Sequence, residues 1–229
     1  MLGAATFRDR AEAGARLGDR VAALLASDDV DQPLLVLGLP RGGVVVAAKV
    51  VRALRSAGID ASLDVFVVRK IGAPWQPELA VGAVADVDGR PEANLNRETI
   101  DSLGVDDAYL QRAIADEHAE ALRRLLAYRG DRPPTSIADA MVIVVDDGVA
   151  TGATVRAALQ VLRRQHPRRL ILAVPVAPAD TLDDLQGEVN DLVCLSSPAF
   201  FTSVGAAYEI FDQTSDEEVI ALLREHAAA

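Results

Sequence analysis

The chain has 229 residues, of which 50% are hydrophobic, 25% charged and only 4% aromatic. This length suits one α/β domain with a small accessory part or, less readily, two small domains, and the composition excludes a disordered chain and a low-complexity fibre. With 23 basic against 34 acidic residues, the net charge is −11, which argues against broad binding to nucleic acid or to anionic membranes. An anionic ligand would therefore have to be held by local features of the chain.

The cysteine count and the apolar runs indicate the cellular compartment of the protein. Cys194 is the only cysteine, so an intrachain disulfide and a cysteine-rich zinc site are excluded. The apolar runs are much shorter than the roughly 20 residues of a membrane-spanning helix, and no signal-peptide pattern opens the chain. We expect a cytoplasmic protein without membrane contact.

Hydrophobic periodicity predicts alternating helices and strands, beginning with an amphipathic helix over residues 7–27. The predicted elements that follow are a strand (33–38), a helix (44–57), a strand (63–68), an exposed loop (70–79), a strand (80–85), a helix (106–128), a strand (141–145), a helix (152–165), a strand (170–176), a short helix (182–186), a strand (189–195) and a closing helix (215–225). The strands are apolar throughout, as in a parallel sheet that is covered on both faces. We therefore predict an α/β fold with a doubly wound, mainly parallel sheet.

In such sheets, ligands bind beyond the carboxyl ends of the strands, where the winding direction switches. The loops after Gly38 and after Val145 are therefore the places where a site is expected.

Residues 142–154 (VIVVDDGVATGAT) combine an apolar strand, two adjacent carboxylates and a small-residue turn that opens a helix. Backbone N–H groups at a helix start can hold a phosphate, and Thr151 and Thr154 would add hydroxyl donors. Asp146 and Asp147 would repel that phosphate, so we expect them to face neutral hydroxyls, a cation or developing positive charge. A phosphorylated sugar offers all three. The alternative is that the two aspartates merely end a strand and Thr151 caps a helix.

At these residues the chain resembles the phosphoribosyltransferases of the type I fold, whose signature is a hydrophobic strand, two acidic residues and a T-G-x-T loop. The resemblance implies that Asp146 and Asp147 bind the ribose 2- and 3-hydroxyls of phosphoribosyl pyrophosphate (PRPP). It also implies Mg2+, which these aspartates would hold weakly and mainly through the ligand. The implied 5-phosphate loop consists of Gly148, Val149, Ala150, Thr151, Gly152, Ala153 and Thr154.

The resemblance extends over nearly the whole chain, so it implies one phosphoribosyltransferase domain over residues 1–229. The expected parts are a core of residues 30–195, a small C-terminal hood of residues 196–214 and a closing helix of residues 215–226. The helix over residues 106–128 has no assigned role, and it could cover the sheet edge or form a homodimer contact.

A second loop, residues 38–43 (GLPRGG), is similar to the family's pyrophosphate loop. Gly42 and Gly43 would let the backbone approach a diphosphate, and Arg41 could supply a bidentate positive fork, although an RGG triplet is also typical of a plain helix-entry turn. The family often holds this loop with a cis peptide bond. Proline lowers the cost of a cis bond from about 2.5–4 to about 0.5–1 kcal/mol, so we predict that bond between Leu39 and Pro40.

Arg69 and Lys70 begin the predicted loop, where the family carries a mobile lid that would exclude water from the reacting sugar. The expected catalytic set is Asp146, Asp147, Arg41 and Lys70. The expected pyrophosphate-binding set is Leu39, Pro40, Arg41, Gly42, Gly43, Arg69 and Lys70. Simple solvation is the alternative for the two basic residues at the strand end, and the role of Trp75 stays open.

The implied reaction displaces pyrophosphate from C1 of PRPP by a nitrogen base, through an oxocarbenium-like sugar. The hood offers Phe200, Phe201 and Tyr208 for stacking on the base, with Phe211 nearby, and the alternative is that they pack on the C-terminal helix. The acceptor is not identified. Hypoxanthine and guanine enzymes carry an aspartate at the position of Ala150, and the motif is closer to the adenine type.

A different function would be that of a catalytically silent sensor of PRPP or nucleotides, which would keep the phosphate loops without turnover. A dinucleotide-binding oxidoreductase is disfavoured, because no G-x-G-x-x-G follows the first strand. The expected partners are PRPP and a small nitrogen base. Direct binding to nucleic acid is not expected, and a homodimer is left open.

Overall fold

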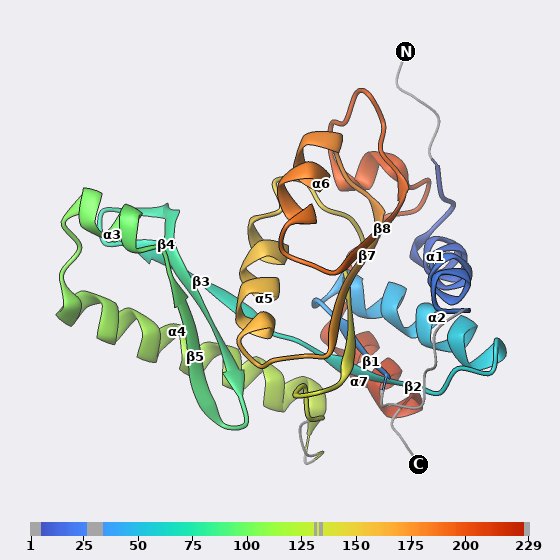
Figure 1. Cartoon of the computed structure of the whole chain (residues 1–229), viewed down its shortest axis with the longest axis horizontal. Coiled ribbons are helices and arrows are strands. Elements are labelled where there is room, and N and C mark those ends of the chain that lie inside the picture. The colour runs from blue at the N-terminus through green and yellow to red at the C-terminus, as the bar shows by residue number, and fades with distance from the viewer. Residues whose placement is uncertain (1–5, 27–33, 131, 133–134, 227–229) are drawn as a thin grey trace.

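A five-stranded parallel sheet forms the centre of the computed structural model, which describes residues 6–26, 34–130, 132 and 135–226 (Figure 1). The strand order is β2–β1–β6–β7–β8. Gly38 at the end of β1 is in register with Val65 of β2 and Val145 of β6, so the carboxyl ends of the three strands share one edge. The bounds are β1 (Leu34–Gly38), β2 (Ala61–Val65), β6 (Met141–Val145), β7 (Arg169–Val176) and β8 (Asp191–Ser196).

Helices cover both faces of this sheet, with α5 and α6 on one side and α1 and α2 on the other (Figure 1). Successive strand residues point to opposite faces, so Val36 packs in the core with α1, α2 and α7, whereas Leu35 packs with α5. Both faces are buried, which confirms the predicted α/β fold. The bounds are α1 (Arg10–Leu25), α2 (Gly42–Ser56), α5 (Ala153–Arg163), α6 (Ala179–Gln186) and α7 (Asp216–Glu225).

A second sheet, with three antiparallel strands in the order β3–β4–β5, stands beside the parallel sheet (Figure 1). Helix α4 joins the two, because Leu110 packs in the core of the small sheet and Leu125 in the main core. Strand β5 and helix α3 were not predicted. The bounds are β3 (Val68–Ala73), β4 (Gln76–Val87), β5 (Arg90–Leu95), α3 (Arg97–Leu103) and α4 (Asp107–Arg129).

The predicted exposed loop over residues 70–79 is wrong, because this segment forms the β3–β4 hairpin. Pro74 and Trp75 make its turn, and Trp75 is 67% exposed. Gly72 favours the hairpin instead of breaking it: a Cβ there would lie 2.5 Å from the carbonyl oxygen of Pro77, so only glycine permits this close approach. The proline and glycine signals were correct for the turn but not for the strands beside it.

Helix α1 begins at Arg10, because Asp9 caps it by accepting a hydrogen bond from the Glu12 N–H at 2.8 Å. Phe7 precedes the helix and pairs with Tyr208 in an isolated parallel bridge. The first turn of α1 thereby lies close to the segment that contains the short helix η1 (Val204–Ala207). The predicted boundaries at residues 27 and 33 lie outside the described residues. No helix in the described ranges is both long and apolar enough to cross a membrane.

Candidate functional site

The two predicted ligand loops lie side by side at the carboxyl ends of β1 and β6. The Leu39 N–H donates to the carbonyl oxygen of Val145 at 2.9 Å. A Cβ on Gly43 would lie 2.7 Å from that same carbonyl oxygen, and a Cβ on Gly42 would lie 1.9 Å from Asp147 Oδ2. The two glycines therefore let the start of α2 approach the acidic pair, a contact that the sequence did not predict.

The predicted pyrophosphate loop, residues 38–43, contains a cis peptide bond between Pro40 and Arg41, so the predicted cis bond between Leu39 and Pro40 is wrong. That prediction compared the intrinsic cost of isolated peptide bonds and took no account of the neighbouring contacts. Leu39 is only 2% exposed and its N–H is bound to β6, so it continues the path of β1. The chain turns toward α2 one residue later.

Asp146 and Asp147 are largely enclosed. The Asp146 carboxylate accepts a hydrogen bond from the Asp147 N–H at 2.9 Å, and Asp147 Oδ2 accepts one from Arg10 Nε at 2.6 Å. Burial, with a smaller contribution from the neighbouring Asp147 charge, raises the pKa of Asp146 well above its usual range. Burial also raises the pKa of Asp147, although Arg10 opposes this. Hydroxyl donors or a further cation would therefore stabilise the ionised pair.

Residues 148–154 form the turn between β6 and α5. Gly152 occupies the N-cap position of α5 with φ of +71°, a conformation that favours glycine, and within the described part of the chain no side chain makes a capping hydrogen bond there. The Thr181 hydroxyl donates to the carbonyl oxygen of Ala150 at 2.9 Å and so ties the turn to α6. Thr151 and Thr154 are exposed beside this helix start. The turn thus has the uncapped N–H groups and hydroxyls that phosphate binding requires.

Arg69 and Lys70 lie on strand β3, and their side chains differ in their surroundings. Arg69 Nε donates to Glu117 Oε2 on α4 at 2.7 Å, and Lys70 is exposed. No contact with the predicted pyrophosphate loop is found for either within the described ranges. Their binding to pyrophosphate stays a prediction.

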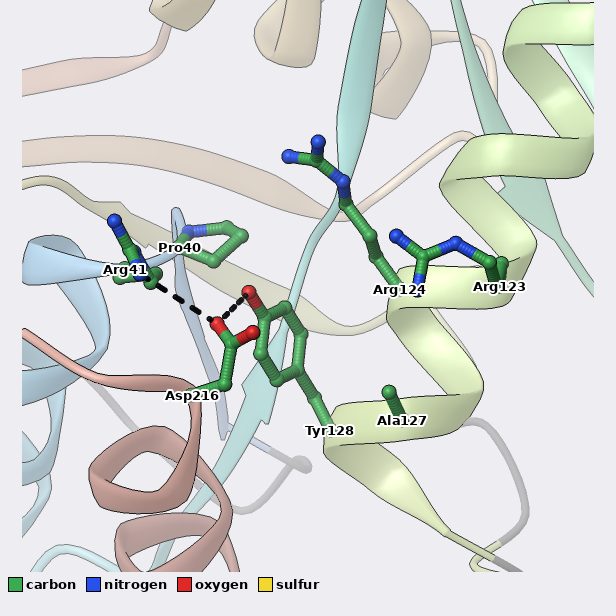
Figure 2. Close-up of a pocket in the computed structure, with 7 residues that line it drawn as sticks. All are labelled: Pro40, Arg41, Arg123, Arg124, Ala127, Tyr128 and Asp216. Carbon is green, nitrogen blue, oxygen red and sulfur yellow. Dashed lines mark hydrogen bonds and ion pairs between the residues drawn. The ribbon is translucent and has the colours of Figure 1, made fainter.

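A pocket of about 310 Å³ beside the predicted pyrophosphate loop is lined by Arg41 and, across from it, by two other basic side chains, Arg123 and Arg124 of α4 (Figure 2). Asp216 Oδ1 accepts a hydrogen bond from the Tyr128 hydroxyl at 2.8 Å and lies 3.9 Å from Arg41 Nη1. Burial, with a further contribution from Asp216, raises the pKa of Tyr128 to about 12, so its hydroxyl remains a donor at neutral pH. The lining residues are Pro40, Arg41, Arg123, Arg124, Ala127, Tyr128 and Asp216.

Arg123 and Arg124 were not predicted as site residues, and Glu120 holds both on the surface of α4. Charged residues on a solvated helix face give no signal of which distant loop they will approach. The segment 106–128 was predicted to be helical, but its place in the fold was not predicted.

The predicted hood residues have very different surroundings. Phe200 is 94% exposed, and Phe201 packs on a small core that contains Tyr208. Tyr208 is 5% exposed, its ring lies between Phe7 and Phe211, and its hydroxyl donates to the main-chain oxygen of Asp147. Tyr208 therefore supports the main chain of the acidic pair. Stacking of a base on these rings stays a prediction.

A family model described as the phosphoribosyl transferase domain matches residues 9–209. The chain belongs to this family. The match spans both ligand loops, the acidic pair and the segment that carries Tyr208, and it confirms the resemblance seen in the sequence.

Curated bacterial proteins are similar to nearly the whole of this chain. Two curated proteins of Mycobacterium tuberculosis, from strains CDC 1551 / Oshkosh and ATCC 25618 / H37Rv, bear the name "Putative phosphoribosyl transferase". Each is 41% identical over 217 residues, which cover 95% of this chain and 46% of the relative. The chain thus spans about half the length of the curated relatives it matches.

Among solved structures, TT1426 from Thermus thermophilus has 42% identity and a TM-score of 0.81. The similarity covers 97% of this chain and 99% of that one. The phosphoribosyl transferase fold is therefore shared over the full domain, including the small antiparallel sheet and the N-terminal helix.

Proposed function

We propose that the domain transfers the 5-phosphoribosyl group of PRPP to a nitrogen base and releases pyrophosphate. One observation carries the proposal: the acidic pair lies directly against Gly42 and Gly43, and the uncapped start of α5 follows a few residues later. The proposed diphosphate loop, the pair of carboxylates and the proposed phosphate loop thus adjoin one another in the order in which PRPP carries its groups.

Residues 148–154 would anchor the 5-phosphate through main-chain N–H groups and the hydroxyls of Thr151 and Thr154. A loop of this kind suits a chain with a net charge of −11, because backbone dipoles supply the positive potential. The ligand would then be fixed at the end far from its reacting carbon.

Asp146 and Asp147 would accept hydrogen bonds from the ribose hydroxyls and stabilise the positive charge that forms on the ring as pyrophosphate departs. The pair suits a magnesium ion held mainly by the ligand, since Mg2+ commonly takes one or two carboxylates together with substrate phosphates. No cluster of three or more metal-ligating side chains occurs in the described part of the chain, which is consistent with this mode. Bound magnesium would neutralise phosphate charge.

The departing pyrophosphate would meet Arg41 and the basic pocket beyond it. Asp216 is the anion that lies near Arg41 in the structure, and pyrophosphate would take its place. Arg123 and Arg124 add positive charge at the rim of the same pocket. Lys70 would join only if the β3–β4 hairpin moved toward the loop.

The acceptor would enter beside the proposed hood, residues 196–214 of what we take to be a single domain. Ala150 is too small and apolar to recognise a purine by a charged hydrogen bond, so recognition of the base would come from other residues. The pairing of copies into a homodimer stays open.

The test is pyrophosphate release from PRPP and Mg2+ with a panel of purine, pyrimidine and pyridine bases. We expect release with at least one base, and we expect Asp147→Asn to reduce it strongly. Arg8→Ala, which removes a guanidinium that is paired with Asp9 on the surface, serves as the control. Absence of both PRPP binding and turnover in the parent protein would refute the proposal.

A sensor of PRPP is the second candidate, and one observation favours it. The aromatic rings near the acidic pair already have partners, because Arg10 lies 3.8 Å from the centre of the Phe211 ring and Tyr208 stacks on that ring at 5.0 Å. A site whose rings are engaged in this way could bind PRPP without using a base. PRPP would then raise the melting temperature while every base failed to release pyrophosphate.

A further inference from the structure

We propose that Arg10 is a positioning residue for sugar binding: it holds Asp147 Oδ2 so that Oδ1 is left to accept a ribose hydroxyl. This inference rests on the proposed function, because the sugar in question is the ribose of PRPP. It assigns a role to the first turn of α1, a segment that contains none of the predicted site residues.

The guanidinium of Arg10 is fixed from three directions. Its Nε donates to Asp147 Oδ2 at 2.6 Å, its Nη1 donates to the main-chain oxygen of Asp212 at 2.7 Å, and its central carbon lies 3.8 Å from the centre of the Phe211 ring. The side chain of Arg10 is only 13% exposed. A planar fork that is held at two edges and one face has a single orientation, and so does the carboxylate that it binds.

Asp147 Oδ2 is enclosed between Arg10 and the pyrophosphate loop. A Cβ on Gly42 would lie 1.9 Å from this oxygen and 2.7 Å from Arg10 Nε, so no ligand atom can enter between them. Across residues 6–26, 34–130, 132 and 135–226, no side chain other than that of Arg10 donates to this carboxylate. Oδ1 is not a buried atom without a partner either. It is therefore the oxygen through which Asp147 can reach a ligand.

The main chain of Asp147 is held as well, because the Tyr208 hydroxyl donates to its carbonyl oxygen. Phe211 connects the two supports, since its ring stacks with that of Tyr208 and also lies against the Arg10 guanidinium. The carboxylate is thus oriented by a unit formed from α1 and the segment before α7. Supporting contacts of this kind set the precision of a binding site.

The test compares the binding of ribose 5-phosphate and of inorganic phosphate to the whole chain by calorimetry. Both probes offer a phosphate, but only the first offers ring hydroxyls, so the preference for ribose 5-phosphate over phosphate, expressed as a ratio of affinities, reports the contribution of the sugar. Loss of a hydrogen bond to a charged group predicts that Arg10→Ala lowers this ratio by about tenfold or more. The Kd for inorganic phosphate should not change, whereas a general loss of structure would weaken the binding of both probes.

Two further variants separate positioning from packing. Arg16→Ala is the matched control, because Arg16 lies on the same helix over the Phe7 ring at 4.8 Å but contacts Thr6 and Glu12 instead of the acidic pair. It should leave the ratio unchanged. In an Asp147→Asn background, Arg10→Ala should produce no further fall, because Arg10 acts through that carboxylate.

Each outcome has a distinct meaning. If the parent protein binds ribose 5-phosphate no more tightly than phosphate, the proposed sugar site itself fails. If it discriminates and Arg10→Ala keeps the ratio, or tightens sugar binding, the role of Arg10 is refuted while the proposed function stands. Should Arg10→Ala not fold, Arg10→Lys replaces it: lysine keeps the charge but lacks the planar fork, so the ratio should fall several-fold, and an unchanged ratio would overturn the inference.

Discussion

Gly42 occupies the tightest point of the site, and we predict that Gly42→Ala both destabilises the protein and abolishes its preference for ribose 5-phosphate over phosphate. The added Cβ would lie 1.9 Å from Asp147 Oδ2 and 2.6 Å from Asp147 Cγ, whereas real Cβ contacts stay beyond 3.0 Å. Asp147 cannot turn aside freely, because Arg10 holds the same oxygen at 2.6 Å. The substitution therefore forces the carboxylate away from Arg10.

Two costs contribute to the expected loss of stability. Overpacking of an enclosed site costs about 1–3 kcal/mol, and loss of a hydrogen bond between charged groups costs about 1.5–3 kcal/mol. Because partial relaxation reduces both, we expect the free energy of unfolding to fall by about 3 kcal/mol, which corresponds to a fall in Tm of about 6–12 °C for a domain of this size.

Urea unfolding and calorimetry with ribose 5-phosphate would measure the two effects. Gly187→Ala is the matched control: this glycine has φ of −73° and no atom within 4 Å of an added Cβ, so the change should be neutral or slightly stabilising. A Gly42→Ala protein that is as stable as the parent and keeps its preference for ribose 5-phosphate would refute the close approach of the two loops.

Three further predictions concern charge. Burial and the Asp147 charge raise the pKa of Asp146 above its usual value. Between the usual and the raised pKa the folded protein binds more protons than the unfolded chain, so the free energy of unfolding is higher at low pH and falls as the pH rises. Asp146→Asn should accordingly increase the free energy of unfolding at neutral pH and flatten its pH dependence, and a loss of stability at pH 7 would contradict this. Arg129→Met should cost about 3–5 kcal/mol in urea unfolding, because it leaves Asp64 buried without its partner at 2.8 Å, and a cost near that of an exposed pair, about 0–1 kcal/mol, would show that the pair is solvated. Arg124→Ala should weaken the binding of pyrophosphate by about tenfold and leave that of ribose 5-phosphate unchanged in calorimetry, and equal weakening of both would place the leaving group elsewhere.

The centre of the fold could be predicted because its signal is local. The run 141–145 is apolar at every position, and only a strand covered on both faces accommodates such a run. The two acidic residues and the Thr-Gly-Ala-Thr turn come next in the sequence, so predicting the strand also predicted their position at the carboxyl end of β6. The small antiparallel sheet was missed because its strands contain proline and glycine, which indicate turns when no neighbouring strand is known.

The supporting contacts of the site could not be predicted, because they join distant parts of the chain. Arg10 and Asp147 are separated by 137 positions. Helical spacing does place Arg10 on the same side of α1 as the buried residues Leu17 and Val21, which sets it apart from Arg16. That spacing does not indicate which distant residue it contacts. The same holds for Arg124, whose approach to Arg41 depends on the path of α4 past the main sheet.

The segment before α1 and the segment that follows η1 are joined by main-chain hydrogen bonds. Phe7 donates to the oxygen of Ala207 at 3.0 Å, and Ile210 donates to the oxygen of Arg8 at 2.8 Å. During synthesis on the ribosome, a nascent chain that has reached residue 195 already holds every strand of the parallel sheet except the last residue of β8, yet Arg10 still lacks Phe211 and Asp212. The contacts that orient Asp147 would thus form only after residue 212 has been made, later than the scaffold that carries them.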